Sequence, residues 1–244
     1  MEAAQAAAQI ISHYYRNGFK VDTKADNTPV TQADIESEQA ISHILQSKFP
    51  DYGFYGEETG KADNDSEFLW LVDPIDGTKS FVRGYPLFST QIALMHKNEV
   101  VLGVSSAPEF NEIATAVRNG GARLNGQEIA VSDVSHLEDA TVSTGNLKSL
   151  ASSDSWPGFG RLVAAANRIR GYGDFYHYHL LATGKIDVVL ESDVNILDIA
   201  ALSVIVEEAG GKFTDVKNKP ITLETTTVLA SNGHLHKIVN DAFL

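Results

Sequence analysis

The chain has 244 residues, of which 43% are apolar and 21% are charged, so it can form one large globular domain or two small ones with a substantial core. Its formal net charge of −13 argues against nucleic acid or an anionic membrane as the main partner, because both would be repelled. It has no cysteine, no basic signal-peptide start and no apolar run long enough to span a bilayer, so we expect a cytoplasmic protein.

Two helices are predicted near the N-terminus. Apolar side chains recur at helical spacing from Ala4 through Ile11 to Tyr14, which predicts an amphipathic helix packed against the rest of the protein. A second helix is expected to begin at Thr31, because its side chain can cap the free amides of a first turn. The expected apolar face of this second helix consists of Ile35, Ile41, Ile44 and Leu45.

Strands follow in the first half, and helices alternate with strands in the second. Strands are predicted over residues 68–73, 88–95, 100–105, 112–118 and 140–143, with turns at Lys97-Asn98-Glu99, Gly120-Gly121 and Asn125-Gly126. Helices are predicted over residues 159–166, 175–183 and 197–209, and strands over 169–171, 186–191 and 212–215. This change of pattern predicts an α+β domain over residues 1–133, with an antiparallel sheet, and an α/β domain over residues 134–244.

Carboxylates gather in three separate segments. In the stretch WLVDPIDGTKSF, residues 70–81, Asp73 and Asp76 come where a buried strand ends, and two carboxylates that close repel unless a cation lies between them. Glu57 and Glu58 lie in the segment YGEETG, and Asp198 opens an apolar helical run. Such oxygen ligands suit a hard cation such as Mg²⁺. The alternative is that these aspartates only cap helices, at Gly77 and at the start of the later run.

Gly77 and Thr78 favour the metal interpretation. A glycine at a helix start lets a ligand approach backbone amides that have no partner in the helix, and those amides favour an anion. Metal-binding carboxylates beside an anion site describe a phosphate site. The sequence therefore predicts metal-assisted attack of water on a phosphate ester.

Four motifs together resemble the inositol monophosphatase superfamily of Mg²⁺-dependent, lithium-sensitive phosphatases. They are GEE at 56–58, DPIDGT at 73–78, LDIAA at 197–201 and EAGG at 208–211, and the resemblance runs roughly from Lys24 to Gly211. It implies a layered αβαβα sandwich of the type shared with fructose-1,6-bisphosphatase. It also implies two to three Mg²⁺ ions per active site, a small phosphate ester as substrate and a homodimer.

The same resemblance implies the metal ligands. Glu57, Asp73 and the backbone carbonyl of Ile75 would bind a first metal. Asp73 would also bind a second metal, together with Asp76 and Asp198, and Glu57 would help to hold a third. The first 133 residues would thus carry most of the ligands, and the second domain would carry the last one.

Further residues match the family around these ligands. Asp34 and Thr78 would accept the proton of the attacking water, and the amides of Gly77 and Thr78 would hold phosphate oxygens. Glu58 would orient ligands, and Lys24 matches a loop that closes over the metals. The alternatives are a first-turn helix residue for Asp34 and a solvated surface residue for Lys24.

The substrate is expected to carry a positive charge. Lys79-Ser80-Phe81 after the threonine resembles the histidinol-phosphatase branch, as does an acid at Asp174, and Glu191 matches the family's substrate-contacting glutamate. These two carboxylates could bind the ammonium and imidazole groups of histidinol phosphate. Asp174 could instead cap the helix that follows it. Leu197 replaces the tryptophan that many members carry before the last metal ligand, which affects the expected shape of the substrate site.

Several alternatives stay open at this point. Inositol phosphate, fructose 1,6-bisphosphate and adenosine 3′,5′-bisphosphate are substrates of the same superfamily. A cation-binding protein that keeps the fold without catalysis would need a replaced ligand, and none is replaced. His177 and His179 are two residues apart, so on a helix they should face different sides and pack or lie near the substrate rather than share a metal.

Overall fold

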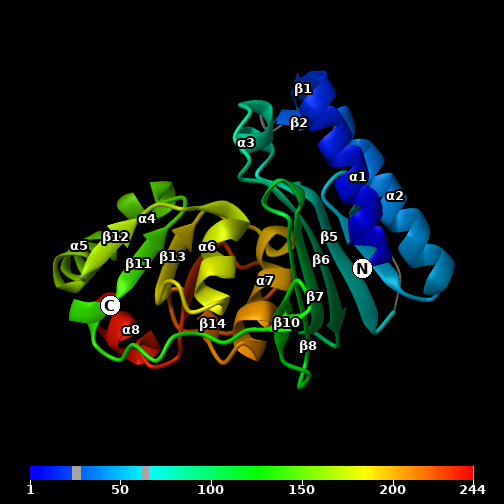
Figure 1. Cartoon of the computed structure of the whole chain (residues 1–244). Helices are drawn as coiled ribbons and strands as arrows, with labels where there is room; N and C mark the ends of the chain where they lie inside the picture. Colours follow the sequence, from blue (N-terminus) through cyan, green and yellow to red (C-terminus); the bar gives the residue numbers. More distant parts are fainter. Residues whose placement is uncertain (24–28, 62–65, 244) are drawn as a thin grey trace.

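The protein is built of five alternating layers of helix and sheet (Figure 1). The structure is a computed structural model that describes residues 1–23, 29–61 and 66–243. The outer helices α1 (Glu2–Asn17) and α2 (Gln32–Lys48) cover one face of a first sheet. Helices α6 (Asp174–Ala182) and α7 (Ile196–Glu208) lie between this sheet and a second one, which α5 (Trp156–Ala165) and α8 (His236–Phe243) cover on its far side. The αβαβα prediction is therefore confirmed.

The first sheet has eight strands in the order β10-β9-β8-β7-β6-β5-β3-β4. Its strands are β3 (Gly53–Gly56), β4 (Gly60–Lys61), β5 (Phe68–Asp76), β6 (Ser89–His96), β7 (Glu99–Ala107), β8 (Glu112–Val117), β9 (Ala122–Leu124) and β10 (Gln127–Glu128). Neighbours are antiparallel except β3 and β5, which are parallel. A separate antiparallel ribbon joins β1 (Val21–Thr23) to β2 (Pro29–Thr31). Two single 3₁₀ turns, η1 (Pro108–Phe110) and η2 (Leu137–Asp139), complete this half.

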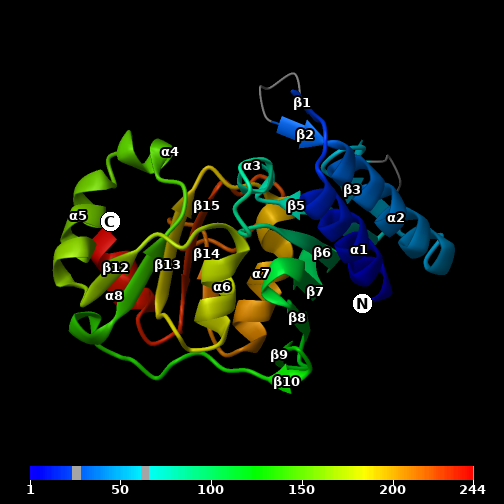
Figure 2. The same cartoon turned by 45° about the horizontal axis from the view of Figure 1, so that its top comes forward.

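The second sheet has five strands in the order β12-β11-β13-β15-β14 (Figure 2). They are β11 (Thr141–Thr144), β12 (Arg168–Arg170), β13 (Val188–Ser192), β14 (Lys212–Thr214) and β15 (Thr227–Ser231), and β11 is parallel to both of its neighbours. A short helix α4 (Lys148–Ala151) follows β11. The two sheets thus divide along the chain, as expected. The division into domains after residue 133 stays a prediction, since α7 contacts strands of both sheets.

The predicted hairpins are confirmed, with differences at some element ends. Lys97 and Asn98 have φ values of 49° and 70°, which suit the two-residue turn between antiparallel strands β6 and β7. Strand β5 runs to Asp76, three residues beyond the prediction, because it continues past a register shift to pair Asp76 with Ser89. Among the described residues, no helix is both long and apolar enough to cross a bilayer.

The predicted inner face of α2 is wrong at Ile35. This side chain is 37% exposed, whereas Ile41 is fully buried. Besides Ala33, the buried positions in the first half of the helix are polar, and they include Asp34 at 0% and Glu38 at 1% exposure. Residues one turn apart share a helix face, so turning Asp34 and Glu38 inward turns Ile35 outward. The contacts of these two carboxylates, described below, explain why this rotation is favourable.

Helix α2 allows a matched test of this packing. Ile41→Ala should lower the free energy of unfolding by about 2–5 kcal/mol, because it removes fully buried methyl groups and leaves a cavity. Ile35→Ala should change it by less than about 0.5 kcal/mol, since a surface position has few contacts to lose. Urea unfolding of both variants measures the difference. Equal destabilisation would contradict the observed orientation of the helix.

Candidate active site

A cleft of about 560 Å³ contains most of the residues that the sequence predicts for the site. The predicted residues that line it are Glu57, Asp73, Ile75, Asp76, Gly77, Thr78, Asp174, Glu191 and Asp198. Asp34 is fully buried and touches the cleft through Thr78, while Glu58 lies outside the lining. Lys24 lies outside the described residues. The fold thus gathers side chains from positions 57 to 198 into one cleft.

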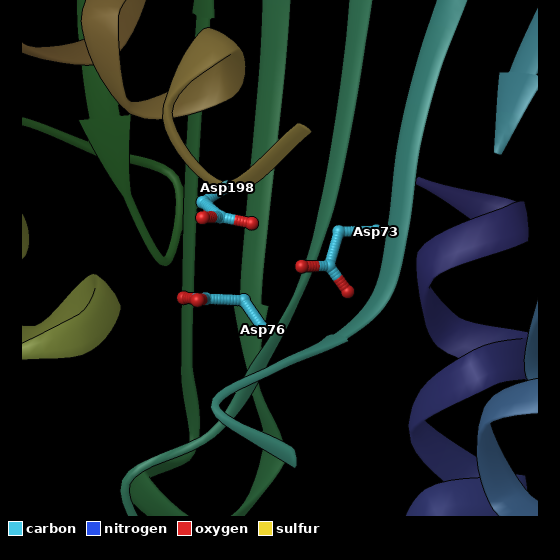
Figure 3. Close-up of side chains that lie close together, drawn as sticks. All are labelled: Asp73, Asp76 and Asp198. Atoms are coloured by element: carbon cyan, nitrogen blue, oxygen red, sulfur yellow. The ribbon is translucent and has the colours of Figure 1, made fainter. Parts of the chain in front are cut away.

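Three aspartates form the centre of this cleft. One carboxylate oxygen each from Asp73, Asp76 and Asp198 lies within 4.8 Å of the others, as Figure 3 shows. The first two come from the irregular end of β5, and Asp198 lies in the first turn of α7. Asp198 also accepts hydrogen bonds from the amide of Asn195 at 2.9 Å and from its side chain at 2.7 Å. Asp198 can therefore take part in the capping box of α7 and in the aspartate cluster at the same time, because a carboxylate has several lone pairs.

The cluster is electrostatically unfavourable without a cation. Burial, followed by repulsion from neighbouring carboxylates, raises the pKa values of Asp73 and Asp76 well above the usual range. Burial is also the main cause that raises the pKa of Asp198 to about 7. An all-oxygen donor set with repelling charges fits a hard divalent cation, which would favour the ionised carboxylates.

Glu57 reaches the cleft from the end of β3, and its loop is fixed by a residue that the sequence analysis missed. Buried Glu38 accepts hydrogen bonds from the amides of Glu58 at 2.8 Å and Thr59 at 2.9 Å. A Cβ at Gly56 would lie 2.5 Å from the Glu38 carboxyl group, so only glycine admits this contact. Glu38 follows Asp34 by one helical turn, and that spacing of two acids was the available signal.

Asp34 and Thr78 meet as the family resemblance implied. The Thr78 hydroxyl lies 3.3 Å from Asp34 Oδ1 and 2.9 Å from the carbonyl oxygen of Ile75. Asp34 Oδ2 accepts hydrogen bonds from the amide and the hydroxyl of Thr31, at 2.7 and 2.6 Å, which completes a capping box at the start of α2. Burial raises the pKa of Asp34, which makes its carboxylate a stronger proton acceptor. Asp34 is thus a first-turn residue of α2 that also contacts Thr78, and its role as proton acceptor stays a prediction.

Gly77 makes a tight turn between β5 and the short helix α3 (Thr78–Val82). Its φ is 88°, and a Cβ would lie 2.5 Å from the carbonyl oxygen of Leu87, so a larger residue would be strained and would clash. Gly77 itself is the N-cap of α3, and no side chain caps this helix. The alternative that Asp73 or Asp76 serves as its cap is therefore wrong.

Asp174 and Glu191 enter the cleft from the C-terminal half. Asp174 is the first residue of α6, and its carboxylate lies 3.4 Å from the Ser80 hydroxyl. The N-cap of this helix is Gly173, and no side chain caps it, so the alternative that Asp174 caps the helix is wrong. Burial, and next the charge of Glu191, raise the pKa of Asp174. Buried Glu191 lies on β13 and accepts a hydrogen bond from the Tyr178 hydroxyl at 2.9 Å.

The two histidines of α6 face different sheets, as predicted. His177 lies 3.1 Å from Glu191 on the second sheet, and His179 lies 2.8 Å from Glu112 on the first. Both imidazoles are buried, at 0% and 2% exposure. Their position between the two sheets excludes a shared metal.

A polar row on β6 supports Asp76 and was missed by the sequence analysis. The Ser89 hydroxyl lies 3.3 Å from Asp76 Oδ2, and the Gln91 side-chain amide donates hydrogen bonds to Ser89 at 2.7 Å and Ser105 at 3.0 Å. Because each hydroxyl accepts from Gln91, its own hydrogen is available for another partner, and for Ser89 that partner is Asp76. The signal was the spacing of two polar residues on one face of an otherwise apolar strand.

Binding of Mg²⁺ should release protons near neutral pH. Protons compete with the metal below the raised pKa of Asp198, about 7, so the apparent affinity should fall as the pH is lowered from 8 to 6. Titration calorimetry in two buffers with different ionisation enthalpies measures the released protons. Equal heats in both buffers at pH 7 would show that the carboxylates are already ionised.

Comparison with known proteins agrees with this geometry. The model of the Inositol monophosphatase family matches residues 1–243. The chain is 38% identical to a histidinol-phosphatase of Mycobacterium tuberculosis, over 89% of this chain and 85% of the relative. It is 34% identical to inositol monophosphatase 2 of Solanum lycopersicum, over 100% of this chain and 94% of the relative. The crystal structure of the extragenic suppressor protein suhB from Bartonella henselae superposes with a TM-score of 0.90 at 30% identity, covering 99% of this chain and 95% of that one. The chain belongs to the inositol monophosphatase family.

Proposed function

We propose that this protein is a Mg²⁺-dependent phosphomonoesterase whose preferred substrate is histidinol phosphate. Two to three Mg²⁺ ions would be held by Glu57, Asp73, the carbonyl of Ile75, Asp76 and Asp198, four of which are carboxylates of one cleft. Bound divalent cations neutralise phosphate charge and lower the pKa of water. They also account for the binding of an anion by a protein with a net charge of −13.

The protein's own residues would position the phosphate and remove the proton. Water oxygen bonds to phosphorus as the bond from phosphorus to the ester oxygen breaks. The leaving alkoxide takes up a proton from solvent and departs as the alcohol, and the pair formed by Thr78 and Asp34 later returns to solvent the proton that it accepts. The proton of the attacking water passes to the pair formed by Thr78 and Asp34, whose raised pKa suits this role. The amides of Gly77 and Thr78 would bind phosphate oxygens at the turn that the positive φ of Gly77 creates.

Thr78→Ala should lower kcat by about 100-fold or more, because it removes the hydroxyl that passes the proton to Asp34. Thr78→Ser keeps a hydroxyl and is the matched control, with an expected loss within about tenfold. Phosphate release measures activity, and calorimetry should give the same Mg²⁺ affinity for both variants. Loss of Mg²⁺ binding in Thr78→Ala would instead indicate a structural role for this threonine.

The single observation that favours a cationic substrate is the pair of carboxylates at the C-terminal side of the cleft. Asp174 and Glu191, with Asp76 and Asp198, line a recess of about 40 Å³ that also contacts apolar Ile199. A water molecule occupies about 30 Å³ in the liquid, so an ammonium group fits this space. Burial, and next repulsion by Glu191, raise the pKa of Asp174, and a cation between the two carboxylates would relieve that repulsion. The hydroxyls of inositol carry no charge, so they would not relieve this repulsion between the two carboxylates.

Asp174→Asn should lower kcat/KM for histidinol phosphate by about 10- to 100-fold, because charge-assisted hydrogen bonds are worth more than neutral ones. Turnover of inositol 1-phosphate should change by less than about threefold, since its hydroxyls can bond to either side chain. Asparagine tolerates the φ of 46° at this position, whereas alanine would add strain. Phosphate release from both esters, with and without Mg²⁺, provides the measurement. Equal losses on both esters, or no preference of the parent for histidinol phosphate, would favour the inositol-type function.

Three alternatives remain measurable in the same assay. An inositol-1-monophosphatase is the first, because inositol monophosphatase 2 of Solanum lycopersicum matches the whole chain. A broad-specificity or adenosine 3′,5′-bisphosphate phosphatase is the second. A non-catalytic cation-binding protein is the third, and it would bind Mg²⁺ without releasing phosphate from any of these esters. We also propose that the protein is cytoplasmic and forms a homodimer. Analytical ultracentrifugation measures the oligomeric state.

A further inference from the structure

Glu191 is held by three donors from two segments, helix α6 and the loop that follows β11. Its Oε2 lies 2.9 Å from the Tyr178 hydroxyl and 3.1 Å from His177 Nε2, and its Oε1 lies 3.2 Å from the backbone amide of Asn146. The carboxylate is 4% exposed, and both side-chain partners are buried. Each carboxylate oxygen has two lone pairs, so Oε2 is saturated and Oε1 keeps one free. Glu191 thus has one remaining acceptor position, on a residue that lines both the cleft and its recess.

The hydrogen-bond partners around His177 favour one tautomer of its ring. The amide of Tyr172 donates to Ser143 Oγ at 3.3 Å, and Ser143 Oγ lies 3.4 Å from His177 Nδ1. If the Ser143 hydroxyl donates to Nδ1, the ring carries its hydrogen on Nε2 and donates it to Glu191. A doubly protonated ring would leave the Ser143 hydrogen, fully buried, without a partner in the described structure. The neutral tautomer satisfies every group.

The protons carried by the His177 ring determine the net charge of the pair that it forms with Glu191. An imidazolium paired with Glu191 would cancel the negative charge that a cationic substrate needs. A neutral imidazole donates a hydrogen bond and leaves the carboxylate at −1. The Tyr178 hydroxyl acts in the same way, because burial raises its pKa well above the usual value and keeps it a donor.

The backbone at Gly145 leaves room for the Glu191 carboxylate. A Cβ at Gly145 would lie 1.8 Å from Glu191 Oε1, so the glycine leaves the space that the carboxylate occupies. The space at Gly145 admits this rotamer of Glu191, and the donors to both of its carboxylate oxygens hold the side chain in it.

We propose that His177 and Tyr178 are positioning residues that determine specificity: they hold Glu191 as an oriented anion whose free lone pair binds the cationic part of the substrate. This inference rests on the proposed preference for a cationic phosphate ester. Neither residue need touch the phosphate or the metal site. Their effect is therefore expected in KM for the cationic ester rather than in kcat.

The test compares Tyr178→Phe and His177→Leu with the parent, with Tyr176→Phe as the control on the same helix. Tyr176 lies outside the lining of the cleft and its recess, and its ring packs on Phe110. Removing a donor to a buried carboxylate should raise KM for L-histidinol phosphate by about tenfold or more, with kcat and the turnover of inositol 1-phosphate changed by less than about threefold. Tyr176→Phe should behave as the parent. Equal losses on both esters in the two test variants would overturn the proposal.

A second measurement does not depend on activity. The ¹⁵N resonances of the His177 ring should show one protonated nitrogen, Nε2, and one unprotonated nitrogen, Nδ1, at pH 7.5 in the unliganded protein. A doubly protonated ring would overturn the proposal even if the variants lose specificity.

Glu191→Gln separates failure of this inference from failure of the proposed function. If this variant loses the preference for histidinol phosphate while Tyr178→Phe and His177→Leu keep it, the positioning role is wrong and the proposed substrate stands. If the parent has no preference for the cationic ester, the proposed substrate is wrong and the inference falls with it.

Discussion

The mutual repulsion of Asp73, Asp76 and Asp198 is the constraint on which the rest of the site depends. Their oxygens lie within 4.8 Å of one another in a buried setting, where like charges interact strongly. The chain holds them there through the irregular end of β5 and through the first turn of α7. A divalent cation bound there would convert this unfavourable cluster into a phosphate-binding site, and this sign reversal would make the net acidity of the protein compatible with an anionic substrate.

The layered fold explains how distant segments support one cleft. Helices α6 and α7 lie between the two sheets, so one helix can contact both (Figure 1). His177 and His179 show the consequence, since one contacts Glu191 on the second sheet and the other contacts Glu112 on the first. The short helix α6 thus contributes both to the lining of the cleft and, together with α7, to the packing between the sheets.

Buried polar residues around the cleft fix the position and orientation of the residues that they contact. Glu38 fixes the loop that carries Glu57, and Gln91 orients the Ser89 hydroxyl towards Asp76. The contact of Glu38 with this loop requires a residue as small as Gly56. The contact of Ser89 with Asp76 depends on Gln91 as a second donor. Buried hydrogen bonds of this kind rigidify a site, because breaking one of them in a buried setting is unfavourable.

The sequence by itself predicted most elements, because strand and helix patterns are local features. Through the family resemblance that DPIDGT and three other motifs carry, it also predicted the layered fold and many of the residues that line the cleft. It failed at Ile35, since apolar periodicity alone does not show that Asp34 and Glu38 turn inward. It also missed Glu38, Gln91 and the partners of Glu191, whose contacts join residues distant in the chain. Only the tertiary structure decided these, because the contact that fixes a polar side chain depends on which other segment folds against it.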